Sequence, residues 1–205
     1  AHGLLGGLQS ARLDSDSRLF WDEYNNYVKQ GLVRAAALAD DGALVNQPTT
    51  VAEVTTYGSF GLSAVVAFAG GYVMAYTQSD DTDTIRYVAL DAALAPRHPV
   101  VDVGAVGAGW WGRGGQLLAR GSEVLLAQVA VTGSHENSDI ARFVVLSRYD
   151  ATGLRLGGPT PLAAPVEDKE LISPLLVSMG EDVGLLWSAG RVIYLCAGCR
   201  PDNAL

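Results

Sequence analysis

The sequence has 205 residues and a net charge of −8, and its only lysines are Lys29 and Lys169. A chain of this length can bury one ordinary hydrophobic core. Its acidic balance excludes a general nucleic-acid binder, which needs a basic patch for phosphates, and no stretch approaches the roughly 18 apolar residues of a membrane span. We therefore expect neither nucleic-acid binding nor membrane insertion.

A turn followed by an apolar strand recurs four times along the chain, at 16–21, 70–76, 121–127 and 180–187. A second pattern follows each copy: an arginine, three small or apolar residues and a leucine. It occurs at Arg34–Leu38, Arg86–Leu90, Arg142–Leu146 and Arg191–Leu195. Two patterns that recur in the same order at about fifty residues indicate repeated units. The units span approximately 4–56, 57–106, 107–166 and 167–205.

Each unit divides into short strands bounded by glycine or Asp/Ser clusters. In the second unit we predict strands at Leu62–Phe68, Tyr72–Thr77, Ile85–Asp91 and Val100–Val103. Some strands, such as Val124–Ala127, are continuously apolar, which indicates burial on both faces. We expect Leu38, Leu90, Leu146 and Leu195 to occupy equivalent buried positions in the four units.

Four short strands per unit at this period resemble the blades of a β-propeller. The resemblance is one of architecture and covers nearly the whole chain, and no blade motif identifies a specific family. We predict an all-β fold in which residues 1–205 form a single β-propeller, or a propeller portion, of four blade-like four-stranded repeats. A β-sandwich is the alternative fold, but it does not explain four copies of one pattern.

The last unit is incomplete, because residues 200–205 are too few and too polar for a fourth strand. We expect the chain to be part of a larger propeller, completed by another part of a longer chain or by a partner chain. The alternative is a self-contained ring of four blades.

The repeated arginines Arg34, Arg86, Arg142 and Arg191 begin the third strand of each unit. As a ring they would bind anions, since arginine donates paired hydrogen bonds to carboxylates and phosphates. Alternatively, each arginine pairs with acidic residues just upstream, such as Asp22 and Glu23. We favour this structural role because it would explain why every unit keeps the arginine.

The connections between second and third strands differ among the units, and two long ones are acidic. The first carries Asp80, Asp81 and Asp83, and the second carries His135, Glu136 and Asp139. These residues are candidate ligand-binding groups, because a rigid scaffold with unlike loops on one face is a common site of function. The segment 79–84 also offers several oxygens to calcium. It lacks EF-hand spacing, so we favour a solvated turn and predict no cofactor or metal.

Trp110 and Trp111 enter the third unit side by side. If exposed, they would stack on a sugar ring and extend the candidate ligand-binding set. If buried, they would fill the space between inner strands, which we favour.

Cys196 and Cys199 have CxxC spacing near the C-terminus. One such pair does not complete a zinc site, and a redox motif would need a helix that is absent from the pattern. A local disulfide is our preferred interpretation, which agrees with an extracellular or periplasmic protein.

Functional motifs are scarce in this sequence. It contains no nucleophile elbow and no phosphate-binding glycine loop before a helix. We therefore place first an exported bacterial propeller that acts as a binding or scaffold module in a larger chain or assembly, and we favour a non-enzymatic function. One alternative is a propeller hydrolase of extracellular glycans, which would need two carboxylates converging in one pocket. The other is a purely structural subunit.

Overall fold

A computed structural model of the chain describes residues 4–79, 83–103, 110–132, 141–162, 171–180, 182–189 and 192–198. Within these ranges the regular secondary structure consists of β-strands. No helix in them is long and apolar enough to cross a membrane.

The strands form four antiparallel sheets that follow one another along the chain. Sheet A contains β1 (Leu4–Leu13), β2 (Asp16–Asn25), β3 (Gln30–Leu38) and β4 (Thr49–Thr55). Sheet B contains β5 (Phe60–Phe68), β6 (Gly71–Ser79), β7 (Asp83–Asp91) and β8 (Val101–Asp102). Sheet C contains β9 (Trp110–Arg120), β10 (Glu123–Thr132), β11 (Ala141–Tyr149) and β12 (Arg155–Pro161). Sheet D contains β13 (Leu171–Met179), β14 (Asp182–Ala189) and β15 (Val192–Ala197).

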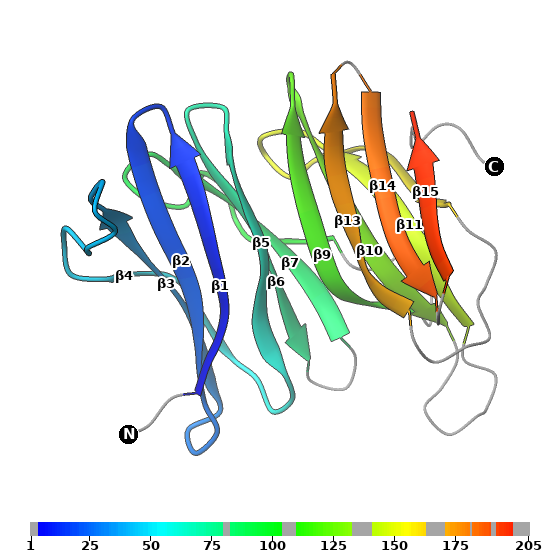
Figure 1. The fold of residues 1–205 in the computed structure, drawn as a ribbon. Coiled ribbons are helices and arrows are strands. Elements are labelled where there is room, and N and C mark those ends of the chain that lie inside the picture. The colour runs from blue at the N-terminus through cyan, green and yellow to red at the C-terminus, as the bar shows by residue number, and fades with distance from the viewer. Residues whose placement is uncertain are drawn as a thin grey trace.

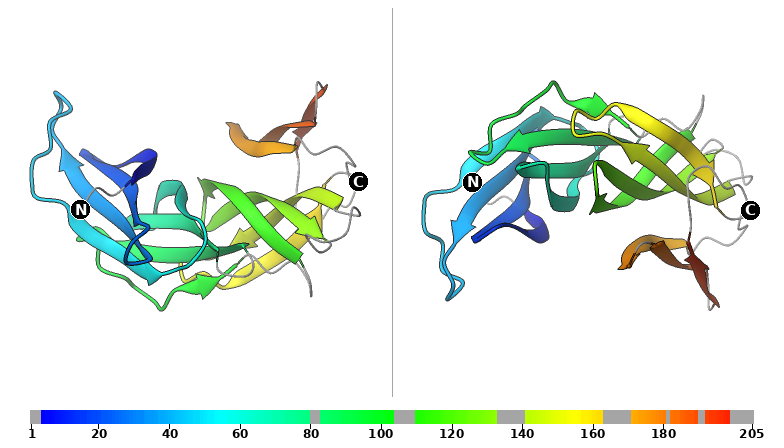
Figure 2. Two further views of the ribbon diagram at one scale, coloured as in Figure 1. Left: turned by 90° about the horizontal axis from the view of Figure 1, so that it is seen from below. Right: turned by 90° about the horizontal axis from the view of Figure 1, so that it is seen from above.

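The four sheets lie one after another along an arc, with their faces packed together (Figure 1). Seen from below and above, they radiate from a common axis (Figure 2). The first strand of each sheet is the inner one, and β1, β5, β9 and β13 contact one another in series. This arrangement confirms the predicted all-β propeller with an incomplete last sheet, and it excludes the β-sandwich.

Tight turns join the first two strands of each sheet. Ala69 and Gly70 both have positive φ angles in the turn between β5 and β6, and Gly121 and Gly180 have positive φ in the corresponding turns of sheets C and D. Such angles suit hairpin turns whose twist matches that of the strands, and glycine adopts them without steric cost. These turn residues explain why the first of the two repeated patterns is visible in the sequence.

Three hydrophobic clusters lie between consecutive sheets. Phe20 of sheet A packs on Tyr72 of sheet B, with ring centroids 5.5 Å apart. Between sheets B and C, Tyr87 packs on Tyr149 at 5.4 Å. Between sheets C and D, the cluster includes Leu146 and Leu185. Sheets B and C are therefore apolar on both faces, which accounts for their continuously apolar strands.

The register of the hairpins corrects the second repeated pattern. Tyr72 and Val124 are each the second residue of a second strand, and they pair with Leu90 and Tyr149. Leu146 therefore lies three residues before the position of Leu90. A shift by an odd number reverses the face of the sheet, so the prediction of four equivalent leucines is wrong.

The leucines instead form two pairs, because Leu38 matches Leu90 and Leu146 matches Leu195. Leu146 and Leu195 pair with the fifth residues of β10 and β14. Continuously apolar strands contain several similar residues, so a five-residue sequence pattern can match them in more than one register.

Candidate functional site

One rim of the propeller collects the connections that differ among the sheets. The first residue of each inner strand pairs with the last or next-to-last residue of the following strand, as in Phe60 with Gln78 and Trp110 with Thr132. The connections between second and third strands and those between sheets therefore meet at the same end, which is the lower end in Figure 1. We call this end the connecting rim.

A buried threonine fixes the connection from sheet A to sheet B at this rim. Thr56 is completely buried, and its backbone nitrogen donates to the carbonyl oxygen of Lys29 at 2.9 Å. The hydroxyl of Tyr24 donates to the carbonyl oxygen of Thr56 at 3.1 Å. The Thr56 hydroxyl in turn donates to the carbonyl oxygen of Ser79 at 2.5 Å. Together these bonds tie the turns of both sheets into one unit.

Two exposed tyrosines stand on these fixed connections. Tyr27 lies in the turn between β2 and β3, where its backbone nitrogen donates to Oδ1 of Asn25 at 3.0 Å. Tyr57 follows Thr56 directly. An exposed tyrosine ring presents an apolar face beside a polar hydroxyl, and this combination suits the mixed surface of a sugar ring. Neither residue belongs to a repeated or charged motif, so the sequence patterns did not single them out as candidates.

Asp22 is the buried carboxylate among the described residues. Its Oδ1 accepts hydrogen bonds from the backbone nitrogens of Gly7 at 2.5 Å and Leu62 at 2.9 Å. Burial raises the pKa of the Asp22 carboxyl, and the two backbone bonds offset part of this effect. Because both donors belong to inner strands, Asp22 joins β1 to β5 and is not available to a ligand.

Carboxylates are absent from the inner strands themselves, since β1, β5, β9 and β13 contain no Asp or Glu. The described ranges also hold no group of three or more His, Cys, Asp or Glu residues placed to bind a metal ion. The inner strands themselves therefore supply no carboxylate to the connecting rim.

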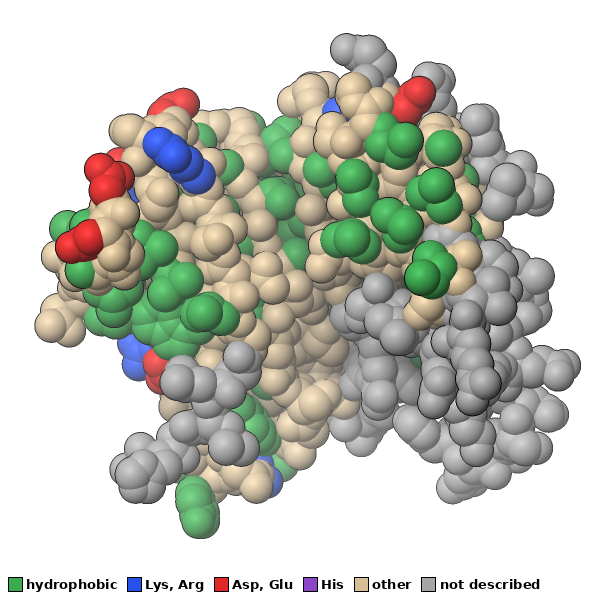
Figure 3. Space-filling model, viewed as in Figure 1, with side chains coloured by type: hydrophobic (Ala, Val, Ile, Leu, Met, Phe, Trp, Pro, Cys, Tyr) green, Lys and Arg blue, Asp and Glu red, His purple; other side chains and the backbone are tan. Residues whose placement is uncertain are grey.

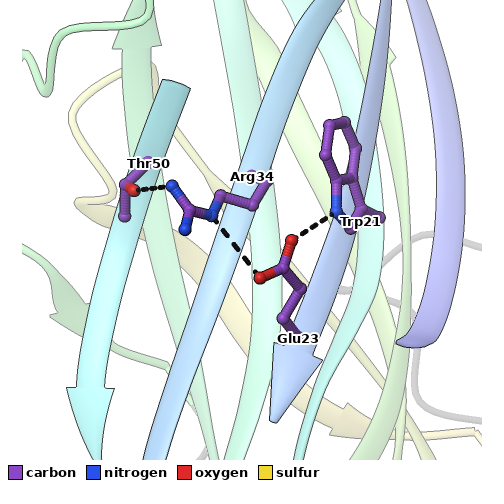
Figure 4. Close-up of polar contacts among 4 residues, drawn as sticks. All are labelled: Trp21, Glu23, Arg34 and Thr50. Carbon is purple, nitrogen blue, oxygen red and sulfur yellow. Dashed lines mark hydrogen bonds and ion pairs between the residues drawn. The ribbon is translucent and has the colours of Figure 1, made fainter. Parts of the chain in front are cut away.

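Glu23 belongs to a polar network across sheet A (Figure 4). Nε1 of Trp21 donates to Oε1 of Glu23 at 2.9 Å, and Nε of Arg34 lies 3.7 Å from Oε2. Nη1 of Arg34 donates to the hydroxyl of Thr50 at 2.6 Å. The Arg34 and Glu23 side chains are both about one-third exposed. Their partners are within their own sheet, as the structural interpretation of the repeated arginines expects.

The other arginines divide as the leucines do. Arg86 matches Arg34, and its Nη1 lies 3.7 Å from Oδ2 of Asp102 in its own sheet. Arg142 lies three residues before the matching position, so the predicted set of four equivalent arginines is wrong. Arg191 lies outside the described residues.

Most predicted ligand-binding residues are not described. Asp80, Asp81, His135, Glu136 and Asp139 lie outside the described ranges, and so does half of the candidate calcium loop. The structure places only the backbone of three others, Asp83 at the start of β7 and Trp110 and Trp111 at the start of β9. Both strand starts are at the connecting rim.

Only one of the two cysteines lies within the described residues. Cys196, in β15, is disulfide-bonded. The sequence contains one other cysteine, Cys199, which lies outside the described residues.

No model of a known protein family matches the sequence, and neither does any curated protein. Among solved structures, an exo-1,5-α-L-arabinanase from a bovine ruminal metagenomic library is 9% identical, with a TM-score of 0.53, covering 94% of this chain and 73% of its own. A complex of BT0996 with RGII is 10% identical, with a TM-score of 0.53, covering 95% and 70%. A GH43 endo-arabinanase from Bacillus licheniformis is 12% identical, with a TM-score of 0.49, covering 93% and 71%.

The two similarities with TM-scores above 0.5 support the propeller fold. They also correct the functional interpretation of the sequence, which placed a binding or scaffold module first. The arabinanase that this chain resembles in fold is a glycan-degrading enzyme, and the binding or scaffold interpretation is therefore not maintained.

Proposed function

We propose that this chain is the propeller of a glycoside hydrolase that acts on a polysaccharide at the connecting rim. The observation that carries the proposal is the similarity to the exo-1,5-α-L-arabinanase over 94% of the chain at a TM-score of 0.53. Arabinan is accordingly the first substrate to test. The exposed rings of Tyr27 and Tyr57 at the same rim support a sugar ligand.

Glycoside hydrolysis needs two carboxyl groups on either side of the bond that breaks. One donates a proton to the leaving oxygen, and the other attacks the sugar or activates a water molecule. Since the inner strands contain no Asp or Glu, we assign both roles to the acidic connections between the second and third strands of sheets B and C. The candidates are Asp80, Asp81, Asp83, Glu136 and Asp139.

An extracellular or periplasmic location fits this proposal. Polysaccharide substrates lie outside the cell, and the disulfide at Cys196 favours an oxidising compartment.

The test is hydrolysis of linear α-1,5-arabinan by the protein as it occurs in its source, measured by the release of reducing ends. We expect release in the wild type and a loss of at least about a hundredfold when a catalytic candidate is neutralised, as in Glu136→Gln or Asp139→Asn. The control is Asp40→Asn, an exposed acid in the connection between β3 and β4 at the opposite rim. The proposal fails if the wild type releases nothing from a panel of polysaccharides, or if neutralising all five candidates leaves the rate unchanged.

A further inference from the structure

Sheets A and D end the series of packed sheets. Among the described residues, sheets B and C are each covered on both faces by neighbours, whereas A packs only on B and D only on C through the three core clusters. Figure 2 shows that the arc stays open between sheets A and D. In the view of Figure 3, hydrophobic side chains gather over sheet D on this open side.

The outer face of sheet D carries apolar residues at positions that are interior in sheet C. Val144 and Leu146 of sheet C are completely buried in the cluster against sheet D. The residues at the same positions of sheet D are Ile193 and Leu195, as their pairing with the seventh and fifth residues of the second strand shows. Ile193 is 76% exposed and Leu195 is 60% exposed. The outer face of sheet D thus carries the apolar side chains of a sheet-packing interface, but no described residues cover it.

Sheet A shows the same relationship on its opposite face. Leu62 of sheet B is 6% exposed and packs against sheet A, whereas the matching Leu8 of sheet A is 65% exposed. Both leucines pair with the sixth residue of the second strand, Tyr76 and Trp21 respectively. This face also carries Leu19 at the position of the buried Met74, together with the Arg34–Glu23 pair. Sheet B likewise carries Arg86 at the position of Arg34 on its covered face.

We propose that the outer faces of sheets A and D bind one further antiparallel sheet, apolar on both faces, supplied by the same polypeptide of the natural protein outside residues 1–205. One face of that sheet covers Ile193 and Leu195, and its other face covers Leu8 and Leu19. The inserted sheet closes the arc around the axis, and it continues the sheet-on-sheet packing already present between A, B, C and D.

The length of the similar structures supports a single sheet in the same chain. The exo-arabinanase matches 94% of this chain, but the match covers 73% of its own length. The remaining quarter or so is about what one more sheet needs beside the four described. The opening is bounded by one face of sheet A and one face of sheet D, so it matches a single inserted sheet. A second copy of this chain would bring four sheets, which is more than this opening requires. This inference does not depend on the proposed enzymatic function.

The test measures whether the two outer faces are covered in the protein as it occurs in its source. Single cysteines are introduced as Leu8→Cys and Ile193→Cys, and their reaction with a thiol reagent is followed without reductant. The control is Leu154→Cys, because Leu154 is 63% exposed and lies in the connection between β11 and β12, outside both faces. Intact mass and light scattering then give the chain length and the number of chains.

We expect Leu8→Cys and Ile193→Cys to react at least about tenfold more slowly than Leu154→Cys, as covered positions do. The particle should contain one chain longer than 205 residues. Equal rates at all three positions would overturn the inference. Protection in a particle of two identical chains, or one that contains a different subunit, would also overturn it, since another occupant would then cover the faces. Hydrolytic activity affects none of these readouts, so failure of one proposal leaves the other testable.

Discussion

The carboxylate of Asp22 in sheet A accepts a hydrogen bond from the backbone nitrogen of Leu62 in sheet B, at 2.9 Å from Oδ1. The same oxygen accepts a second bond from Gly7 on β1, at 2.5 Å. One buried side chain on a second strand thus holds two inner strands side by side. This junction should therefore affect the stability of the fold, the pH dependence of that stability and the tolerance of β1 for an added side chain.

Replacing Asp22 with alanine should lower the free energy of unfolding by about 2–4 kcal/mol, because one buried and one partly buried backbone donor lose their acceptor. Urea denaturation of the variant and the wild type measures the difference. Asp40→Ala, which removes an exposed carboxylate, should stay within about 0.5 kcal/mol. A loss at Asp22 no larger than at Asp40 would show that the junction contributes little to stability.

The junction should also make stability depend on pH. Burial raises the pKa of Asp22 in the folded protein above its ordinary value of 3.8, so the folded state holds this proton more tightly than the unfolded state. The contribution is complete below pH 3.8 and is lost as the pH rises through the folded-state pKa. Subtracting the unfolding free energies of Asp22→Asn from those of the wild type across this range isolates it. A difference that grows with rising pH would contradict the stated direction.

Gly7 should not tolerate a side chain, although its φ angle is ordinary. A Cβ at Gly7 would lie 2.6 Å from the carbonyl oxygen of Leu62, so Gly7→Ala must push β1 away from β5. We expect a loss of about 1–3 kcal/mol in chemical denaturation. Gly61→Ala on β5 is the matched control, because a Cβ there meets nothing within 4 Å. Equal effects of the two substitutions would show that the close approach of the strands is not limiting.

Leu146 and Leu195 should respond differently to truncation in the 205-residue chain, although they occupy the same position in successive sheets. Leu146→Ala removes a completely buried side chain and should cost about 2–5 kcal/mol. Leu195→Ala removes one that is 60% exposed and should stay within about 1 kcal/mol. Thermal or urea unfolding separates the two. Similar losses would mean that Leu195 is already covered in this chain.

The rim tyrosines should act on substrate binding if the proposed hydrolysis is correct. Tyr57→Ala and Tyr27→Ala remove stacking surfaces and should raise KM for arabinan about threefold to tenfold while kcat is retained. Val28→Ala, at an exposed non-aromatic position in the turn of Tyr27, is the control. An unchanged KM in both tyrosine variants would place sugar binding away from this part of the rim.

Much of the candidate site could be located only coarsely from the sequence. The unlike connections of the units predict a variable rim, and the strand register brings the ends of these connections together. Asp22 and Glu23, in contrast, stand side by side in the sequence and have unrelated roles. Asp22 points into the junction with sheet B, while Glu23 faces the other side and pairs with Arg34. Alternation along a strand predicts opposite faces, but it does not say which neighbour each face meets.

The sequence by itself determined the strands, the hairpin turns and the number of units, because these depend on local preferences. The positive φ angles at Gly121 and Gly180, and an apolar run such as Val124–Ala127, each depend on only a few neighbouring residues. Only the tertiary structure decided the register of the third strands. A continuously apolar strand can pair with its neighbour in more than one register, and the packing of the adjacent sheet determines which residues face it. The same packing decided burial: Leu146 is interior because sheet D covers it, and Leu195 is exposed because no described sheet covers it in turn.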